Sequence, residues 1–271
     1  MTAIVGVHGI GKYDYYLKAG NSVIGASEAM RVKWDRYLHA ALGGEARAYF
    51  TDIAYFAHLL NDPRPPGKPE PEELAAPAQQ MLVAWAKERG LGEHMTGALH
   101  QFTGWLLGRL DGKAAAFAKL FAPEVAAYLT NPEKREKSRQ AVAEVIRRNR
   151  PRVIVAHSLG SVVTYEALWA NPDLRADLLI TLGSPLGMRN VVFDRLLPAP
   201  INGHGARPRG VGRWVNIADK DDIAAIPPEL RHTFTGVDEE KLVNLDWLDF
   251  HTAEKYLGCG ALAPYLRPYL T

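Results

Sequence analysis

The segment from Val153 to Thr164 constrains the fold of this chain more than any other. An apolar, β-branched run ends in Ser158, which has the small residues Ala156 and Gly160 two positions away on either side, and a helix-compatible stretch follows at once. This pattern predicts a serine on a sharp strand-to-helix turn, with its hydroxyl clear of the backbone and able to attack an electrophile. The alternative is that Ser158 serves only as the N-cap of the following helix.

Short apolar runs, each followed by a loop or a helix, recur along the chain and predict the fold class. They cover residues 3–8, 153–156, 178–182 and 214–217, and a further strand is expected at 46–51. Such runs are typical of parallel strands that are buried on both faces. With 271 residues, of which 47% are hydrophobic, the chain is long enough for one large domain. We therefore expect an α/β fold, a mostly parallel sheet flanked by helices, over residues 1–271.

The middle of the chain predicts helices only. Residues 61–77 are rich in proline and acidic residues and indicate an exposed connection. From about residue 73 to 146 no convincing strand appears, and two apolar faces stand out: Met81, Leu82 and Trp85 on one, and Phe102, Trp105, Leu106 and Leu110 on the other. This block is longer than one crossover needs, so residues 62–132 are expected to form a helical cap inserted in the domain.

Composition excludes several classes of protein. The formal net charge is +2 with both signs interspersed, which calls for no nucleic-acid partner. Cys259 is the only cysteine and rules out an internal disulfide and zinc-finger spacing. The beginning of the chain lacks the pattern of a signal peptide, and no stretch is apolar for long enough to cross a bilayer. We expect a cytoplasmic protein with no metal and no organic cofactor.

A nucleophilic serine needs a base, and the base needs an acid that orients it. In open α/β sheets these groups lie in loops at the carboxyl ends of strands. One acidic cluster fits, Asp219 to Asp222, directly after the run 214–217. Asp221 is the predicted acid because the chain turns apolar after the cluster, with Asp219 and then Asp222 as the alternatives.

Nine histidines compete for the role of the base. His251 follows the last strand-like run, 241–245, precedes a short predicted helix at 253–257, and completes the chain order Ser, Asp, His. His232 is the alternative, since it is nearer to the acidic cluster in sequence. His157 adjoins the serine but is expected to point away from it and to pack.

Attack on a carbonyl also needs donors for the developing oxyanion. The first expected donor is the backbone N–H of Leu159, which opens the helix after the serine. The second is the N–H of Ile10, in the glycine-containing loop 8–11 after the first strand, where glycine lets the backbone approach a substrate closely. The alternative for this loop is a plain tight turn.

Two other motifs are set aside. Residues 6–12 fit a phosphate-binding loop of the form GxxxxGK, but Tyr13 follows where that loop needs Ser or Thr to hold magnesium. Ser184 also follows an apolar run, but Pro185 comes next and has no N–H to offer an oxyanion. Ser184 is therefore expected to be structural or to line the pocket.

Together these motifs resemble the α/β-hydrolase superfamily, in particular its lipase- and esterase-like serine hydrolases. The resemblance rests on residues 7–11, 156–160 and 182–185 and on the late Asp and His, and Ala156 departs from it where the usual motif has glycine. It implies a Ser-His-Asp triad of Ser158, His251 and Asp221 that cleaves carboxylic esters or thioesters through an acyl-enzyme.

The substrate is expected to be a small molecule or acyl group, and a hydrophobic one, because capping helices bury apolar groups and exclude water. Three alternatives keep the same fold. The acyl group passes to an amine or alcohol, as in an acyltransferase or a macrocyclising thioesterase; the enzyme is a peptidase; or the chain is a binding protein without catalysis.

Overall fold

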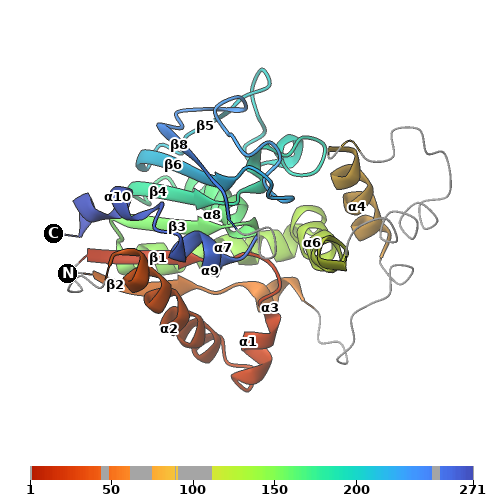
Figure 1. The fold of residues 1–271 in the computed structure, drawn as a ribbon. Helices are drawn as coiled ribbons and strands as arrows, with labels where there is room; N and C mark the ends of the chain where they lie inside the picture. Colours follow the sequence, from red (N-terminus) through yellow and green to blue (C-terminus); the bar gives the residue numbers. More distant parts are fainter. Residues whose placement is uncertain are drawn as a thin grey trace.

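A six-stranded, entirely parallel sheet forms the centre of the computed structural model, which describes residues 2–43, 49–61, 75–88, 90, 112–245 and 251–270 (Figure 1). The strand order is β2-β1-β3-β4-β6-β8. The strands are β1 (Thr2–Val7), β2 (Tyr49–Ala54), β3 (Val153–His157), β4 (Ala176–Leu182), β6 (Val211–Asp219) and β8 (Glu239–Val243). The predicted α/β fold, a parallel sheet flanked by helices, is confirmed.

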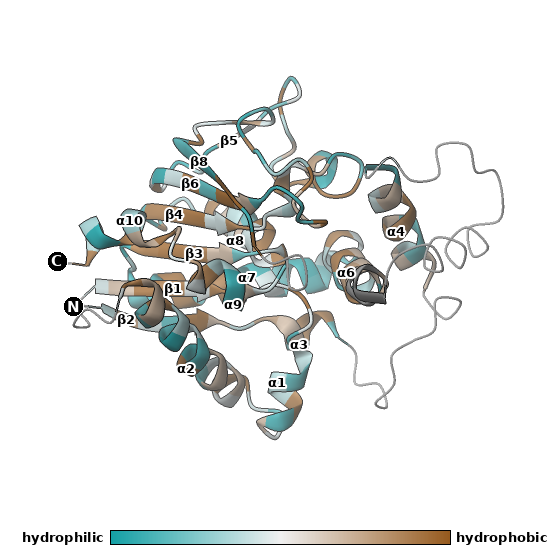
Figure 2. Cartoon of the chain, in the orientation of Figure 1, coloured by the Kyte–Doolittle hydropathy of each residue, from teal (hydrophilic) through white to brown (hydrophobic). Residues whose placement is uncertain are grey.

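Helices cover both faces of this sheet. On one face lie α2 (Val23–Ala41), α9 (Ala253–Gly258) and α10 (Ala263–Leu266), and on the other lie α7 (Pro132–Asn149) and α8 (Leu159–Ala170). Figure 2 shows the central strands as hydrophobic between helices whose outer sides are more hydrophilic. Every residue of β3 is buried, as expected for a strand covered on both faces.

The remaining elements are short. They are α1 (Tyr13–Lys18), α3 (Ala57–Leu60), the 3-10 turns Pro185–Gly187, Phe193–Arg195 and Arg267–Tyr269, and a two-stranded sheet of β5 (Gly205–Ala206) and β7 (Phe234–Thr235). Of the strand expected at 46–51, residues 46–48 lie outside the described part of the chain, and the observed β2 extends to Ala54.

Side-chain N-caps mark the starts of α7 and α2. α7 begins after Asn131, whose side chain accepts from the N–H of Lys134 at 3.0 Å. α2 begins after Ser22, whose side chain accepts from the N–H of Gly25, and the later Ser27 does not cap the helix. Ser27 instead donates its hydroxyl to the carbonyl of Ile53 and ties α2 to the sheet at 2.7 Å.

Two helices of the expected cap, α4 (Ala76–Glu88) and α6 (Gly112–Thr130), lie beyond the carboxyl ends of the strands (Figure 1). The face of Met81, Leu82 and Trp85 is fully buried. The second expected apolar face, Phe102 to Leu110, lies outside the described residues. The extent of the cap therefore remains a prediction, whereas the position of α4 and α6 beyond the strand ends is observed.

A buried carboxylate joins three helices. Glu166 of α8 has a side chain that is 0% exposed, and it accepts from the guanidinium of Arg135 on α7 and from the hydroxyl of Tyr128 on α6, the latter at 2.7 Å. Since a buried charge is tolerated only when it is paired and hydrogen-bonded, this cluster fixes α6 and α7 against the helix that follows β3.

The order of strands sets the position of the site. β1 pairs with β2 on one side and with β3 on the other. The chain leaves the end of β1 toward β2, whereas it leaves the end of β3 toward β4, so the two loops diverge. In parallel α/β sheets ligands bind in the crevice that such a divergence opens.

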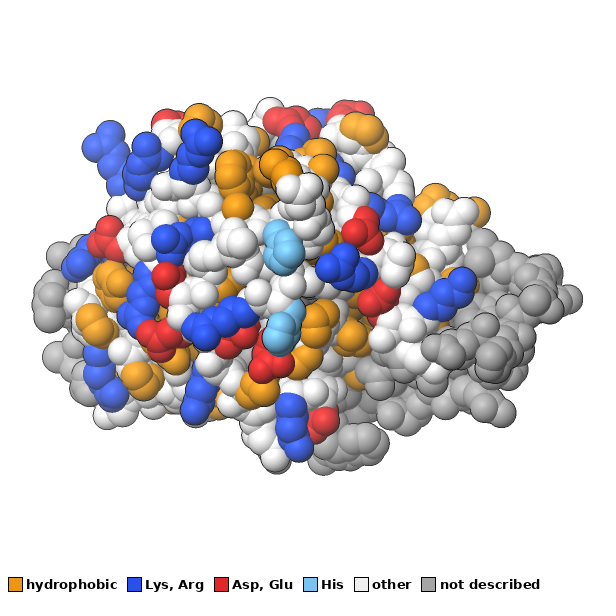
Figure 3. Space-filling model, turned by 90° about the horizontal axis from the view of Figure 1, so that it is seen from above, with side chains coloured by type: hydrophobic (Ala, Val, Ile, Leu, Met, Phe, Trp, Pro, Cys, Tyr) orange, Lys and Arg blue, Asp and Glu red, His pale blue; other side chains and the backbone are white. Residues whose placement is uncertain are grey.

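One face of the molecule carries charged side chains of both signs, which Figure 3 shows interspersed. Within the described residues, no helix combines the length and the apolar character that crossing a membrane would require.

Candidate active site

Ser158 occupies the turn between β3 and α8, as predicted. Its backbone has φ 53° and ψ −132°, a conformation that residues other than glycine rarely adopt. Although Ser158 stands at the N-cap position, its side chain makes no capping hydrogen bond. The N-cap alternative therefore does not describe what this hydroxyl does.

The small neighbours of Ser158 are required by close backbone contacts. A Cβ atom on Gly160 would lie 2.7 Å from the carbonyl oxygen of Val7, and one on Gly9 would lie 2.6 Å from the Cβ of Ser158. Ala156, by contrast, sits fully buried inside β3, paired with Val7 of β1. Thus glycine is needed after the serine, while alanine is accommodated before it.

A serine, a histidine and a carboxylate form a continuous chain of hydrogen bonds. The Oγ of Ser158 lies 2.7 Å from Nε2 of His251, and Nδ1 of His251 lies 2.8 Å from Oδ2 of Asp222. A carboxylate can only accept, so Nδ1 carries the proton and donates it to Asp222. Nε2 is left as the acceptor that faces the serine hydroxyl.

The predicted acid, Asp221, is corrected to Asp222. The side chain of Asp221 is 70% exposed and lies 3.5 Å from the ammonium of Lys220. Asp219 is buried, but its carboxylate accepts from the N–H groups of Asp221 and Leu245 and so joins the ends of β6 and β8. Only Asp222 points inward to the imidazole.

The predicted base, His251, lies against the serine, and the alternative His232 does not. His232 is 75% exposed in its side chain, and its nearest charged partner is Glu229 at 4.0 Å. His157 packs as expected, with its ring centroid 4.9 Å from that of His251. Burial holds the pKa of His157 well below its ordinary value, so it stays neutral beside the other imidazole.

Tyr256 of α9 is a site residue that the sequence did not reveal. Its hydroxyl donates to Oδ2 of Asp222 and accepts from the N–H of Asp219, both at 2.7 Å. Burial raises the pKa of Tyr256 far above its usual value, which keeps the hydroxyl a donor. Gly183 makes room for this pair, because a Cβ there would lie 2.7 Å from Asp222 Oδ2.

The loop after β1 lies against the serine. Gly9 contacts Ser158, and Leu159 is the first residue of α8, whose N–H has no acceptor within its own helix. His8 links this loop to the segment after β2. Its Nε2 accepts from the N–H of Phe56 at 3.0 Å, and its Nδ1 lies 2.7 Å from the carbonyl of Gly9. Burial lowers the pKa of His8 to about 3, so this ring is neutral. The expected donor Leu159 thus directly follows the serine, and the other, Ile10, follows Gly9, whose backbone lies close to Ser158.

Both α4 and α6 contact the loops of the site. The indole N–H of Trp85 on α4 donates to the carbonyl of Ile223, the residue after Asp222, at 2.8 Å. Glu124 on α6 accepts from the N–H of Gly11 at 3.0 Å. Ser158 is fully buried and the side chain of His251 is only 6% exposed, so the hydroxyl is closed off from solvent in this structure.

The set-aside serine is structural. The hydroxyl of Ser184 lies 2.6 Å from that of Ser161 and accepts from the N–H of Leu186, in the turn Pro185–Gly187 after β4. It makes no contact with the imidazole among the described residues.

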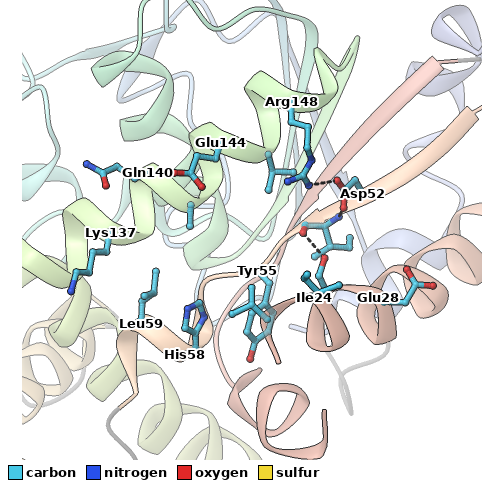
Figure 4. A pocket seen from close by; sticks show the side chains of 15 residues that line it. Ile24, Glu28, Asp52, Tyr55, His58, Leu59, Lys137, Gln140, Glu144 and Arg148 are labelled. Carbon is cyan, nitrogen blue, oxygen red and sulfur yellow. Dashed lines mark hydrogen bonds and ion pairs between the residues drawn. The ribbon is translucent and has the colours of Figure 1, made fainter. Parts of the chain in front are cut away.

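A surface cavity of about 470 Å³ lies apart from these residues, between α2, the end of β2 and α7 (Figure 4). Asp52 and Arg148 bridge its wall at 2.7 Å, and Tyr55 and His58 form its floor. None of Ser158, His251 and Asp222 lines it. Within the described residues, no group of His, Cys, Asp and Glu has an arrangement that would hold a metal ion.

Comparison with known proteins gives one likeness. The chain matches no family model and no curated protein. Among solved structures it is similar to the esterase domain of a Rhodothermus marinus protein, at 13% identity and a TM-score of 0.35, over 100% of this chain and 88% of that one. A likeness at this level carries no argument about activity, so the function is argued from the site itself.

Proposed function

We propose that this protein is a serine hydrolase that cleaves carboxylic esters or thioesters through an acyl-enzyme. The observation that carries the proposal is the continuous line from Ser158 Oγ to His251 Nε2 and from His251 Nδ1 to Asp222, at the carboxyl end of a parallel sheet. The strained backbone of Ser158 supports it, because such strain persists where function requires it.

In the proposed reaction, the oxygen of Ser158 attacks the carbonyl carbon while its proton passes to Nε2 of His251. Asp222 stabilises the imidazolium that forms. The negative oxygen of the tetrahedral intermediate accepts from the N–H groups of Ile10 and Leu159. The C–O or C–S bond then breaks, and the leaving group takes the proton from Nε2. Water attacks the acyl-enzyme with His251 again as the base, which restores the serine.

The substrate class follows from the surroundings of the site. Ile10, Leu159 and Ile223 belong to the same hydrophobic cluster as Trp85 and Phe121 of the two cap helices. We propose an apolar acyl group, since these side chains offer an acyl chain an apolar surface and exclude water.

Steady-state hydrolysis of p-nitrophenyl esters of increasing chain length tests the proposal. Ser158→Ala and His251→Ala should each lower kcat by about 10³-fold or more, while His232→Ala should change it by about twofold or less. Unchanged hydrolysis by Ser158→Ala, with the purified wild type active, would remove the serine mechanism.

A further inference from the structure

The loop that carries the proposed oxyanion donor is held by side chains from several elements. The N–H of Gly11 donates to Glu124 of α6 at 3.0 Å, and the carbonyl of Lys12, the residue after the loop, accepts from the hydroxyl of Tyr55 at 2.8 Å. Near the start of the loop, the backbone of Gly9 lies so close to Ser158 that a Cβ there would be 2.6 Å from the Cβ of the serine. Ile10 lies between these fixed points.

Glu124 is an uncommon residue to find at such a place. It is only 6% exposed, and within the described residues its hydrogen-bond partners are the N–H of Gly11 and, at 3.5 Å, the side-chain amide of Asn61. Lys12 is the cation whose charge acts on it, and burial outweighs that charge and raises the pKa of Glu124 to about 7. Burying a carboxyl group costs free energy unless hydrogen bonds or opposite charges compensate for it. We therefore expect Glu124 to have a role that requires its buried position.

The backbone of the loop makes the contact specific. Gly11 has φ +71°, a backbone conformation that residues with a side chain rarely adopt. This conformation sets the direction of its N–H. The loop has little room to move toward the serine, because even a Cβ atom on Gly9 would lie 2.6 Å from the Cβ of Ser158. The hydrogen bond from Gly11 to α6 therefore limits how the peptide before it, that of Ile10, is oriented.

We propose that Glu124 is a positioning residue, which holds the loop of Gly9 to Gly11 so that the N–H of Ile10 faces the oxyanion formed at Ser158. This inference rests on the proposed function. It makes α6 part of the catalytic apparatus through the hydrogen bond that Glu124 accepts from the N–H of Gly11. A group with this role acts on the tetrahedral state more than on the bound ester, because the oxyanion forms only as the carbonyl is attacked.

Two substitutions at Glu124 separate positioning from general support of the fold. Glu124→Gln keeps an oxygen acceptor for the N–H of Gly11, whereas Glu124→Ala removes it. With p-nitrophenyl butyrate, the alanine variant should lose about tenfold or more in kcat with KM within about threefold, as expected for a loosened oxyanion donor. The glutamine variant should keep kcat within about threefold. Glu144→Gln, on the exposed side of α7, is the matched control and should leave kcat unchanged.

The inhibition constant of a tetrahedral analogue is a measurement that a purely structural role of Glu124 would leave unchanged. A trifluoromethyl ketone forms an anionic adduct with Ser158, so its inhibition constant should rise in Glu124→Ala by a factor close to the loss in kcat. If the alanine variant does not fold, Glu124→Asp retracts the carboxylate by one methylene and should show the same two losses.

Folded variants that keep both kcat and the inhibition constant would overturn the proposal, as would a glutamine variant as impaired as the alanine one. Failure of the proposed function is distinct from either result. In that case the wild type itself neither hydrolyses the ester nor binds the ketone.

Discussion

At the scale of single residues, the site depends on how one carboxylate is held. Asp222 accepts from Nδ1 of His251, from the hydroxyl of Tyr256 at 2.7 Å and from the N–H of Ala224 at 2.8 Å. One donor lies two residues after Asp222 and the other two lie close together near the end of the chain, and all three converge on one buried group. Together they fix the orientation of the carboxylate and, through it, the plane of the imidazole.

Asparagine substitutions distinguish the acid from its neighbour. Asp222→Asn should lower kcat/KM for an activated ester by about 10³- to 10⁴-fold, because an amide does not stabilise the imidazolium and favours the wrong tautomer. Asp221→Asn should change it by about twofold or less, since that side chain is solvated. Equal losses in the two variants, measured side by side with circular dichroism as a check on folding, would show that the assignment is wrong.

Removing one hydroxyl tests the role of Tyr256. Tyr256→Phe removes the hydroxyl that donates to Asp222 and accepts from the N–H of Asp219. It does so without opening a cavity. We expect kcat to fall by about tenfold and the free energy of unfolding by about 1–2 kcal/mol. Tyr269→Phe, near the end of the chain, is a control for loss of a hydroxyl and should leave kcat unchanged.

Residue-scale prediction from sequence had a definite limit. Ser158 and His251 stand out because one ends an apolar strand between small residues and the other follows the last strand. Asp221 and Asp222 are adjacent in a turn, and apolar residues follow both. Whether one or the other faces inward is decided by the turn at Asp219, whose carboxylate binds the N–H of Asp221. No periodicity in the sequence encodes this choice.

At the scale of elements, hydrogen bonds join α4 and α6 to the loops of the sheet. Trp85 joins α4 to the loop of the acid, and Glu124 joins α6 to the loop after β1. The sequence predicted the apolar face of α4, since Met81, Leu82 and Trp85 recur with helical spacing. It did not indicate that Glu124 is buried, because a lone glutamate in a helix is ordinarily solvated.

The buried carboxyl of Glu124 makes stability depend on pH. Its pKa is about 7 in the folded protein and 4.5 in the reference state, so between these values the folded state binds more protons and stability falls as pH rises. Relative to the wild type, Glu124→Gln should therefore gain about 3 kcal/mol between pH 4.5 and pH 8. Urea unfolding of both proteins at several pH values measures this. A difference that stays constant with pH would show that the carboxyl is not titrating in that window.

At the scale of the whole molecule, one topology brings the site together. Gly9 after β1, Ser158 after β3 and Asp222 after β6 lie at the carboxyl edge of the parallel sheet, and His251 reaches the same edge, so residues far apart in sequence meet there. The strands were predictable because burial on both faces gives continuous apolar runs. The extent of the cap was not, since its helices repeat an apolar spacing that packing on the core would also produce.

The buried pair of Arg135 and Glu166 is expected to stabilise the packing of α6, α7 and α8. Arg135→Ala leaves the carboxylate of Glu166 buried without a cation and should lower the free energy of unfolding by about 3–5 kcal/mol. Adding Glu166→Gln should recover part of that loss, because an amide oxygen still accepts from Tyr128. Lys137→Ala, which breaks an exposed pair with Glu133, should cost about 1 kcal/mol or less. Similar losses for the two single variants in urea unfolding would contradict this account.

The central claim is that the hydroxyl of Ser158 is a nucleophile activated by His251. Covalent labelling with a fluorophosphonate, followed by mass spectrometry of the peptides, tests it most directly. The account predicts one adduct, on Ser158, formed rapidly by the wild type and by Asp221→Asn, slowly by Asp222→Asn, and not at all by Ser158→Ala. Folded wild type that stays unlabelled, or an adduct on another serine such as Ser184, would contradict it.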